Sequence, residues 1–168
     1  GKFWFGDEPN TKRISKIECK PKDLYFVIHF EENTTPGNIM KKFLKKEVTI
    51  LKEWEHQFEN VINIAGNVPL AQDLAIMSHL DLMVAMDSSN GHLAALYNIP
   101  VLTLWGVTHP YAGFTPFNQP NEHQLVSNRE EYPLIPTSVY GNKSPKGYEN
   151  AMRSISVETV LNKINELI

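Results

Sequence analysis

The residues best suited to chemistry lie together in the run Asp-Ser-Ser-Asn-Gly-His at 87–92. This run follows an apolar stretch and has the composition of a helix start. The first N–H groups of a helix have no intrahelical partner and carry a partial positive charge, so they can hold a phosphate. Small side chains in the run would let the phosphate approach the main chain closely. Because no Lys or Arg occurs from Val61 to Asn128, main-chain groups would have to bind the anion.

Asp87 is not expected to contact the diphosphate, because the two negative charges would repel each other. The carboxylate is expected to accept hydrogen bonds from sugar hydroxyls. The alternative is ordinary helix capping, since Asp87 and Ser88 are both common capping residue types. His92 likewise has two interpretations, because at helical spacing it shares a face with Leu96 and Ile99 and so fits a partly buried packing role.

The elements around this run predict a Rossmann-like α/β fold. Apolar runs of strand length alternate with stretches of helical periodicity, and short links join them. This order favours parallel strands with helices on both faces. Strands are expected at 24–30, 61–65, 82–86 and 101–105, and helices at 49–60, 69–80, 92–97 and 157–168.

The length of 168 residues fits one domain. We assign residues 24–168 to one Rossmann-like domain and leave 1–23 unassigned, as either an interdomain remnant or an added strand. Residues 107–121 and 129–148 are rich in Pro, Gly and Asn and are expected to form long surface loops. The first of these loops contains His109 and Tyr111, for which ligand contact and loop packing are equally compatible.

The sequence lacks the signals that mark several other classes of protein. The formal net charge of -3 gives no general attraction to nucleic acid. One cysteine and no suitable His/Cys/Asp/Glu spacing argue against a structural metal site. There is no G-x-G-x-x-G run, no Walker motif and no nucleophile elbow, so no cofactor is expected. No apolar run reaches the roughly 18 residues that span a bilayer. We expect a cytoplasmic protein, with peripheral attachment at the inner membrane face as an alternative.

The run D-S-S-N-G-H-L-A-A-L and the following N-I-P-V-L-T-L-W-G-V-T-H-P resemble the ADP-heptose:lipopolysaccharide heptosyltransferases of bacteria. The resemblance covers about residues 47–125. It implies a GT-B fold with two Rossmann-like domains, of which this chain resembles the carboxyl-terminal, donor-binding one. The matching positions are Asp87, Ser88, Ser89, His92, Leu93, Ala94, Pro100, Gly106, Thr108 and Pro110.

The resemblance also implies roles for single residues. Asp87 would contact the transferred sugar, and the main chain at Ser88 and Ser89 would hold the diphosphate. His92 would brace the turn. The resemblance further implies that Val68 contacts the adenine, that Glu47 or a nearby carboxylate binds the ribose, and that His109 lines the cleft.

Two positions depart from the family pattern. Ser89 stands where the family usually has Gly, so the need for a positive φ there is in doubt. The family's phosphate-binding lysine has no clear match, and Lys45 and Lys46 are equally compatible with a solvated helix face.

The expected function is glycosyl transfer from an ADP-sugar, a heptose being moved to a lipid-linked saccharide of lipopolysaccharide. The catalytic base and the acceptor site are expected in a missing amino-terminal domain, so no catalytic residue is assigned here. The alternatives are a non-catalytic nucleotide-sugar-binding module, or a GT-B transferase or epimerase that uses another nucleotide sugar.

Overall fold

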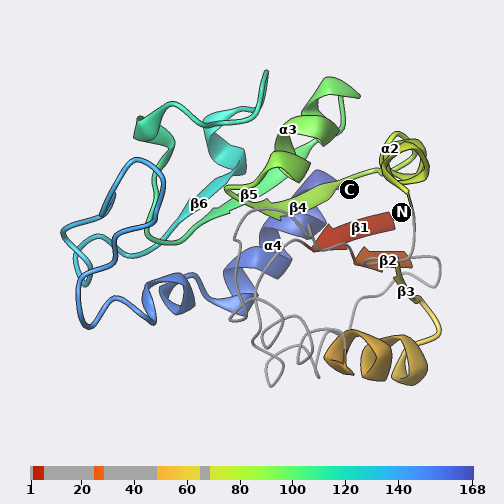
Figure 1. The fold of residues 1–168 in the computed structure, drawn as a ribbon, viewed down its shortest axis with the longest axis horizontal. Helices are drawn as coiled ribbons and strands as arrows, with labels where there is room; N and C mark the ends of the chain where they lie inside the picture. Colours follow the sequence, from red (N-terminus) through yellow and green to blue (C-terminus); the bar gives the residue numbers. More distant parts are fainter. Residues whose placement is uncertain (1, 6–24, 29–48, 65–68) are drawn as a thin grey trace. The chain divides into compact units, whose positions relative to one another are not determined.

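The computed structural model describes residues 2–5, 25–28, 49–64 and 69–168 (Figure 1). Two compact units divide the chain, Gly1–Leu80 and Asp81–Ile168. Glu47 and Val68, two of the predicted donor-binding residues, lie outside the described residues. The amino-terminal unit provides strands and helices of the α/β fold, and the carboxyl-terminal unit contains the described part of the candidate site.

The amino-terminal unit contains three parallel strands in the order β3-β2-β1. Two predicted strands are confirmed as somewhat shorter elements, and part of the unassigned segment 1–23 is a strand paired with β2. A helix covers residues 49–57, and its Glu55 side chain accepts a hydrogen bond of 2.9 Å from the main-chain N–H of Asn63 in β3. The strands are β1 (Lys2–Phe5), β2 (Tyr25–Ile28) and β3 (Val61–Asn63), and helix α2 spans Leu70–Met77.

The carboxyl-terminal unit also contains three parallel strands, in the order β4-β5-β6. β4 and β5 confirm the strands expected at 82–86 and 101–105. β6 was not predicted, because three half-buried residues are too few to show a periodic pattern. The strands are β4 (Met83–Met86), β5 (Val101–Trp105) and β6 (Gln124–Val126), and the helices are α3 (Ser89–Leu96) and α4 (Val157–Leu167).

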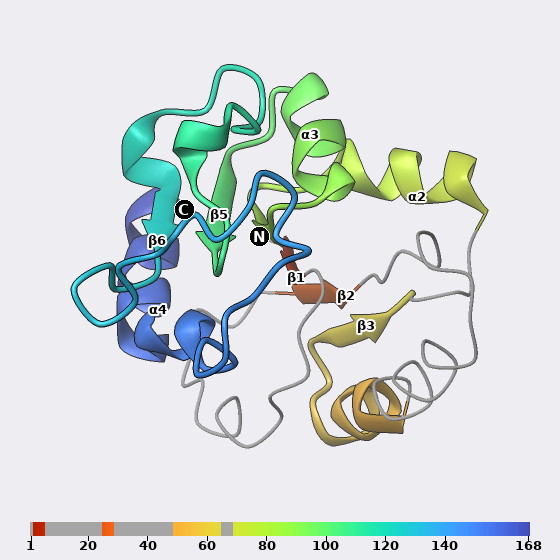
Figure 2. The ribbon, with the colours of Figure 1, turned by 60° about the vertical axis from the view of Figure 1, so that its left-hand side comes forward.

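The two helices of this unit lie on different sides of β5 (Figure 2). A Cβ added to Gly91 of α3 would lie 3.4 Å from Val101 and 3.5 Å from Ala85, so these two residues face α3. Side chains alternate along a strand, so Thr103 and Trp105 face the same way as Val101. Apolar contact of this kind holds α3 against the sheet.

Helix α4 begins with a capped turn, since the Ser156 hydroxyl accepts a hydrogen bond of 3.0 Å from the N–H of Thr159. This is the preferred way to satisfy one of the unpaired N–H groups of a first turn. Ile164 is 2% exposed, so the face of α4 that carries it is buried, whereas Ile168, just after the helix, is 52% exposed.

The segment 129–148 forms the expected irregular loop, but part of it is buried. Tyr132 and Ile135 are buried in it and pack with Ala151, Val107 and Tyr148. The expected surface loop is therefore confirmed as an irregular and mostly exposed segment, and its aromatic and aliphatic residues add a small core of their own. Within the described ranges, the structure contains no helix with the length and apolar character needed to cross a membrane.

Candidate functional site

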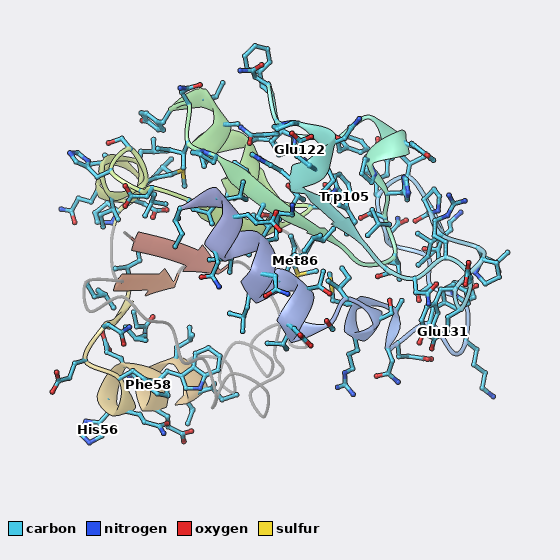
Figure 3. The ribbon with its side chains drawn as sticks, turned by 180° about the vertical axis from the view of Figure 1, so that it is seen from behind. His56, Phe58, Met86, Trp105, Glu122 and Glu131 are labelled. Atoms are coloured by element: carbon cyan, nitrogen blue, oxygen red, sulfur yellow. The ribbon has the colours of Figure 1, made fainter. Side chains whose placement is uncertain are left out.

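The carboxyl ends of β4, β5 and β6 lie at one edge of the unit, because the strands are parallel. Met86 pairs with Leu104, and Trp105 pairs with Val126. Figure 3 marks Met86 and Trp105, the last residues of β4 and β5. Ligands of open α/β sheets bind outside this edge. The chain segments that follow these strands therefore form the candidate site.

Helix α3 begins directly after this edge, with Ser88 as its N-cap residue. The backbone of Ser88 is extended, with φ of -143° and ψ of 162°, but its side chain forms no capping hydrogen bond. The Ser88 hydroxyl is buried and, among the described residues, has no hydrogen-bond partner. Capping by this side chain, one of the two alternatives drawn from the sequence, is therefore wrong. The first turn of α3 also lacks an acidic residue.

Two further polar side chains are buried in this unit, one in α3 and one in β5. Asn90 and Thr103 are each 1% exposed. Within the described part of the chain, neither the amide group of Asn90 nor the hydroxyl of Thr103 has a hydrogen-bond partner. A buried polar group without a partner costs about 1–3 kcal/mol. Native proteins keep few such groups, and ligand sites are among the places where they occur.

Asp87 lies between the end of β4 and the start of α3. Its burial raises the pKa of the carboxyl group, while a hydrogen bond from the Thr108 side chain and the charge of His92 oppose that rise. Thr108 is 7% exposed and follows β5, so it holds Asp87 from the neighbouring strand end. A carboxylate held in this way is oriented before any sugar binds.

Replacing Asp87 with asparagine is expected to stabilise the folded chain at pH 7. The folded-state pKa lies above the unfolded one, so the ionised carboxylate destabilises the native state as the pH rises through the folded pKa. The amide can still accept the Thr108 hydrogen bond and carries no charge. Thermal unfolding from pH 3 to pH 8 tests this: the gain of the variant should appear above the folded pKa and shrink at low pH. A variant that is less stable at pH 7 would contradict it.

Gly141 supports Thr108 from a distant part of the sequence. Its φ is +65°, in the region that favours glycine, and a Cβ there would lie 2.9 Å from Cγ2 of Thr108. The segment is fixed nearby, because the N–H of Thr137 donates to the carbonyl of Val107 over 2.9 Å. Gly141 therefore permits the close approach that keeps Thr108 beside Asp87.

Replacing Gly141 with alanine is expected to weaken the binding of a nucleotide sugar at Asp87, although Asp87 itself is unchanged. The added methyl group must displace Thr108, and the residue would be strained at positive φ, at a cost of roughly 1–2 kcal/mol. Affinity for a nucleotide sugar should fall by about 3- to 10-fold, as measured by calorimetry. Gly147→Ala is the matched control, because it has φ of +94° but no atom within 4 Å of the added Cβ. Equal losses in both variants would show that strain alone is responsible.

A second cluster follows the end of β5. His109 is 6% exposed, and its Nδ1 accepts a hydrogen bond of 3.1 Å from the N–H of Tyr111, which closes the short helix η2 (Pro110–Ala112). Burial lowers the pKa of His109, and the charge of Arg129 lowers it further, so the ring is neutral at pH 7. The His109 and Tyr111 rings lie 4.0 Å apart, and Tyr111 is 81% exposed.

The structure brings together some of the predicted donor-binding residues. Asp87, Ser88, Ser89 and His92 lie in and just before the first turn of α3. His109 is adjacent in sequence to Thr108, which contacts Asp87. Glu47 and Val68 are outside the described residues, so their expected roles stay predictions.

Other side chains weighed in the sequence are also placed. His92 is half-buried, but Leu96, on its expected apolar face, is 73% exposed. Trp105, the last residue of β5, is fully buried and donates a hydrogen bond to Gln124. Sequence reasoning missed the support of Asp87 by Thr108, although Thr108 was part of the quoted motif, and it missed Gly141 and Arg129 altogether. In the part of the chain that the structure describes, no group of three or more His, Cys, Asp or Glu residues is arranged to hold a metal ion.

The sequence matches the family model described as Glycosyltransferase family 9 (heptosyltransferase) over residues 41–146. It is 29% identical over 110 residues to lipooligosaccharide heptosyltransferase 2 of Haemophilus influenzae. That alignment covers 66% of this chain but only 30% of the relative, so the chain spans less than a third of that protein.

Solved structures show the same fold. A family 9 glycosyl transferase from Veillonella parvula is similar with a TM-score of 0.61 and 15% identity, over 99% of this chain and 45% of the other. The iron-containing dodecameric glycosyltransferase TibC from enterotoxigenic E. coli gives a TM-score of 0.54 and 12% identity, over 98% of this chain and 44% of the other. These likenesses confirm the expected fold class, a parallel α/β sheet with flanking helices of the GT-B type.

The family model matches more than half of the chain, and its family is the one that the 87–110 motif resembles. The relative from H. influenzae and the structural neighbours agree with that assignment. The chain therefore belongs to glycosyltransferase family 9, the heptosyltransferase family.

Proposed function

We propose that this chain binds the donor in a transferase that moves a heptose from ADP-heptose to a saccharide of lipopolysaccharide. The observation that carries the proposal is the start of α3, where a helix amino terminus adjoins Asp87 at the carboxyl edge of the strands. The name of the H. influenzae relative supports the sugar and the acceptor. In this proposal the catalytic base and the main binding site of the lipid-linked acceptor belong to a second domain of the full protein.

The diphosphate would bind to the main-chain N–H groups at Ser88 and Ser89. No cationic side chain is near them in sequence, since Lys and Arg are absent from 61 to 128. Fixed dipoles need no reorganisation as negative charge grows on the leaving diphosphate. Loss of one such donor typically costs on the order of 3 kcal/mol in transition-state stabilisation.

The sugar would lie against Asp87, whose carboxylate accepts hydrogen bonds from sugar hydroxyls. The acceptor hydroxyl would attack the anomeric carbon from the face opposite the diphosphate, and the bond from that carbon to the diphosphate oxygen would break. The hydroxyl proton passes to the base of the second domain. Thr108 keeps Asp87 in place by a hydrogen bond, and burial raises the pKa of the Asp87 carboxyl group.

Calorimetric titration of the chain with ADP, UDP, GDP and ADP-heptose tests the proposal. We expect ADP and ADP-heptose to bind and the other two nucleotides to bind at least about tenfold more weakly, which corresponds to roughly 1.4 kcal/mol. We also expect no heptose transfer by the chain alone. Preference for UDP or GDP would overturn the donor, and transfer by the chain alone would overturn the need for a second domain.

A further inference from the structure

The exposed ring of Tyr111 is the least explained feature of the candidate site. Tyr111 is 81% exposed, whereas its neighbour in the same turn, His109, is 6% exposed. The main-chain N–H of Tyr111 is bonded to His109 Nδ1, which fixes the backbone, and the His109 ring lies 4.0 Å from the Tyr111 ring. Gly113, at φ of 84°, ends the turn. The turn that carries the ring is thus fixed, one side of the ring contacts His109, and most of its surface is open to solvent.

Arg129 places a positive charge beside this ring. The guanidinium carbon lies 6.0 Å from the centre of the Tyr111 ring. The Nε–H donates to the carbonyl of Ile135 over 3.1 Å, which fixes the orientation of the guanidinium plane. Among the described residues, no carboxylate forms an ion pair with Arg129, so its two terminal nitrogens can donate to a ligand. Terminal guanidinium nitrogens bind carboxylates and phosphates in a planar, two-bond geometry.

We propose that Tyr111 and Arg129, supported by His109, form a binding platform for the acceptor, a saccharide that carries an anionic group. The inference rests on the proposed function. The apolar C–H face of a pyranose ring packs against the Tyr111 ring, and a phosphate or carboxylate on the sugar meets Arg129. Aromatic rings combined with a few placed polar groups are typical of small-molecule sites.

The position in the fold selects the acceptor and not the donor as the occupant. The platform follows the ends of β5 and β6, at the same edge of the unit as Asp87. Thr108 contacts Asp87, and the next residue is His109. A second sugar on the platform would therefore approach the donor sugar at Asp87. His109 is neutral, which leaves Arg129 as the cation of the platform.

Titrations followed by amide NMR test the platform on the full chain saturated with ADP. The probes are mannose 6-phosphate, glucuronic acid, methyl mannoside and inorganic phosphate. We expect mannose 6-phosphate and glucuronic acid to bind in the millimolar range with shifts at Tyr111 and Arg129. Tyr111→Ala should weaken both by about fivefold. Arg129→Gln should weaken both by a similar factor and leave methyl mannoside unchanged. Tyr97→Ala, which removes a 44% exposed ring at the far end of α3, should change nothing.

Two results would overturn the platform. The first is binding of the sugar acids that neither Tyr111→Ala nor Arg129→Gln weakens. The second is inorganic phosphate binding as tightly as mannose 6-phosphate and independently of Tyr111, which would leave a plain anion site. ADP affinity, measured in parallel, should be the same in all variants. Failure of the wild-type chain to bind ADP would contradict the proposed function. Whether sugar binding depends on Tyr111 would still test the platform in that case.

Discussion

Replacing Asp87 with alanine is expected to weaken ADP-heptose binding by about 10- to 100-fold and to leave ADP binding nearly unchanged. Hydrogen bonds to a charged group contribute roughly 1.5–3 kcal/mol, and each 1.4 kcal/mol is a factor of ten in affinity. ADP lacks the heptose, so it lacks the hydroxyls that would donate to this carboxylate. Calorimetry with the two ligands measures the difference directly.

Asp81→Ala is the matched control for this change. Asp81 is exposed and precedes β4, at the opposite end of the strand from Asp87. Its replacement should alter neither affinity. Equal losses of ADP and ADP-heptose in Asp87→Ala would show that Asp87 shapes the turn and does not bind the sugar.

Replacing Ser89 with proline is expected to weaken ADP binding by about 10- to 100-fold, because proline has no N–H to donate to the diphosphate. Position 89 is the first residue of α3, where proline is well tolerated in helices. The extended backbone of Ser88, at φ of -143° and ψ of 162°, is also the conformation that proline favours in the preceding residue. The change therefore removes one donor and keeps the helix.

Ser89→Ala distinguishes the contributions of the main-chain N–H and the side-chain hydroxyl to ADP binding, because it loses the hydroxyl and keeps the N–H. It should bind ADP far better than Ser89→Pro. Adenosine, which has no phosphate, should bind both variants like the wild type and so shows that each has folded. If the alanine variant loses as much ADP affinity as the proline variant, the side chain is the ligand and the main-chain account is wrong.

The main elements of the central part of the fold could be predicted from the sequence, because they are local and periodic. The apolar run Val101–Trp105 is β5 with those bounds, and the polar run after Met86 is the start of α3. β6 has only three half-buried residues, so no pattern marks it. The small core of segment 129–148 depends on contacts with Val107 and Ala151, which periodicity does not register.

The residues that support the site were harder to predict from the sequence, because their contacts also join distant parts of the chain. Gly141 approaches Thr108 across more than thirty residues of chain, and Arg129 reaches the ring of Tyr111 from the segment after β6. Neither pair has a spacing that belongs to a helix or a strand. The sequence did indicate the residues at 87–92, because a strand end, a helix start and small polar residues coincide there.

Amide NMR of the uniformly ¹⁵N-labelled chain, titrated separately with ADP and with adenosine, tests the central claim most directly. The two ligands differ only in the diphosphate, so the difference between their shifts reports where that group binds. We expect the largest ADP-specific shifts at the amides of residues 88–91, where the N–H groups of the α3 first turn would donate to the diphosphate. Unchanged amides at 88–91, with the largest ADP-specific shifts elsewhere, would contradict it.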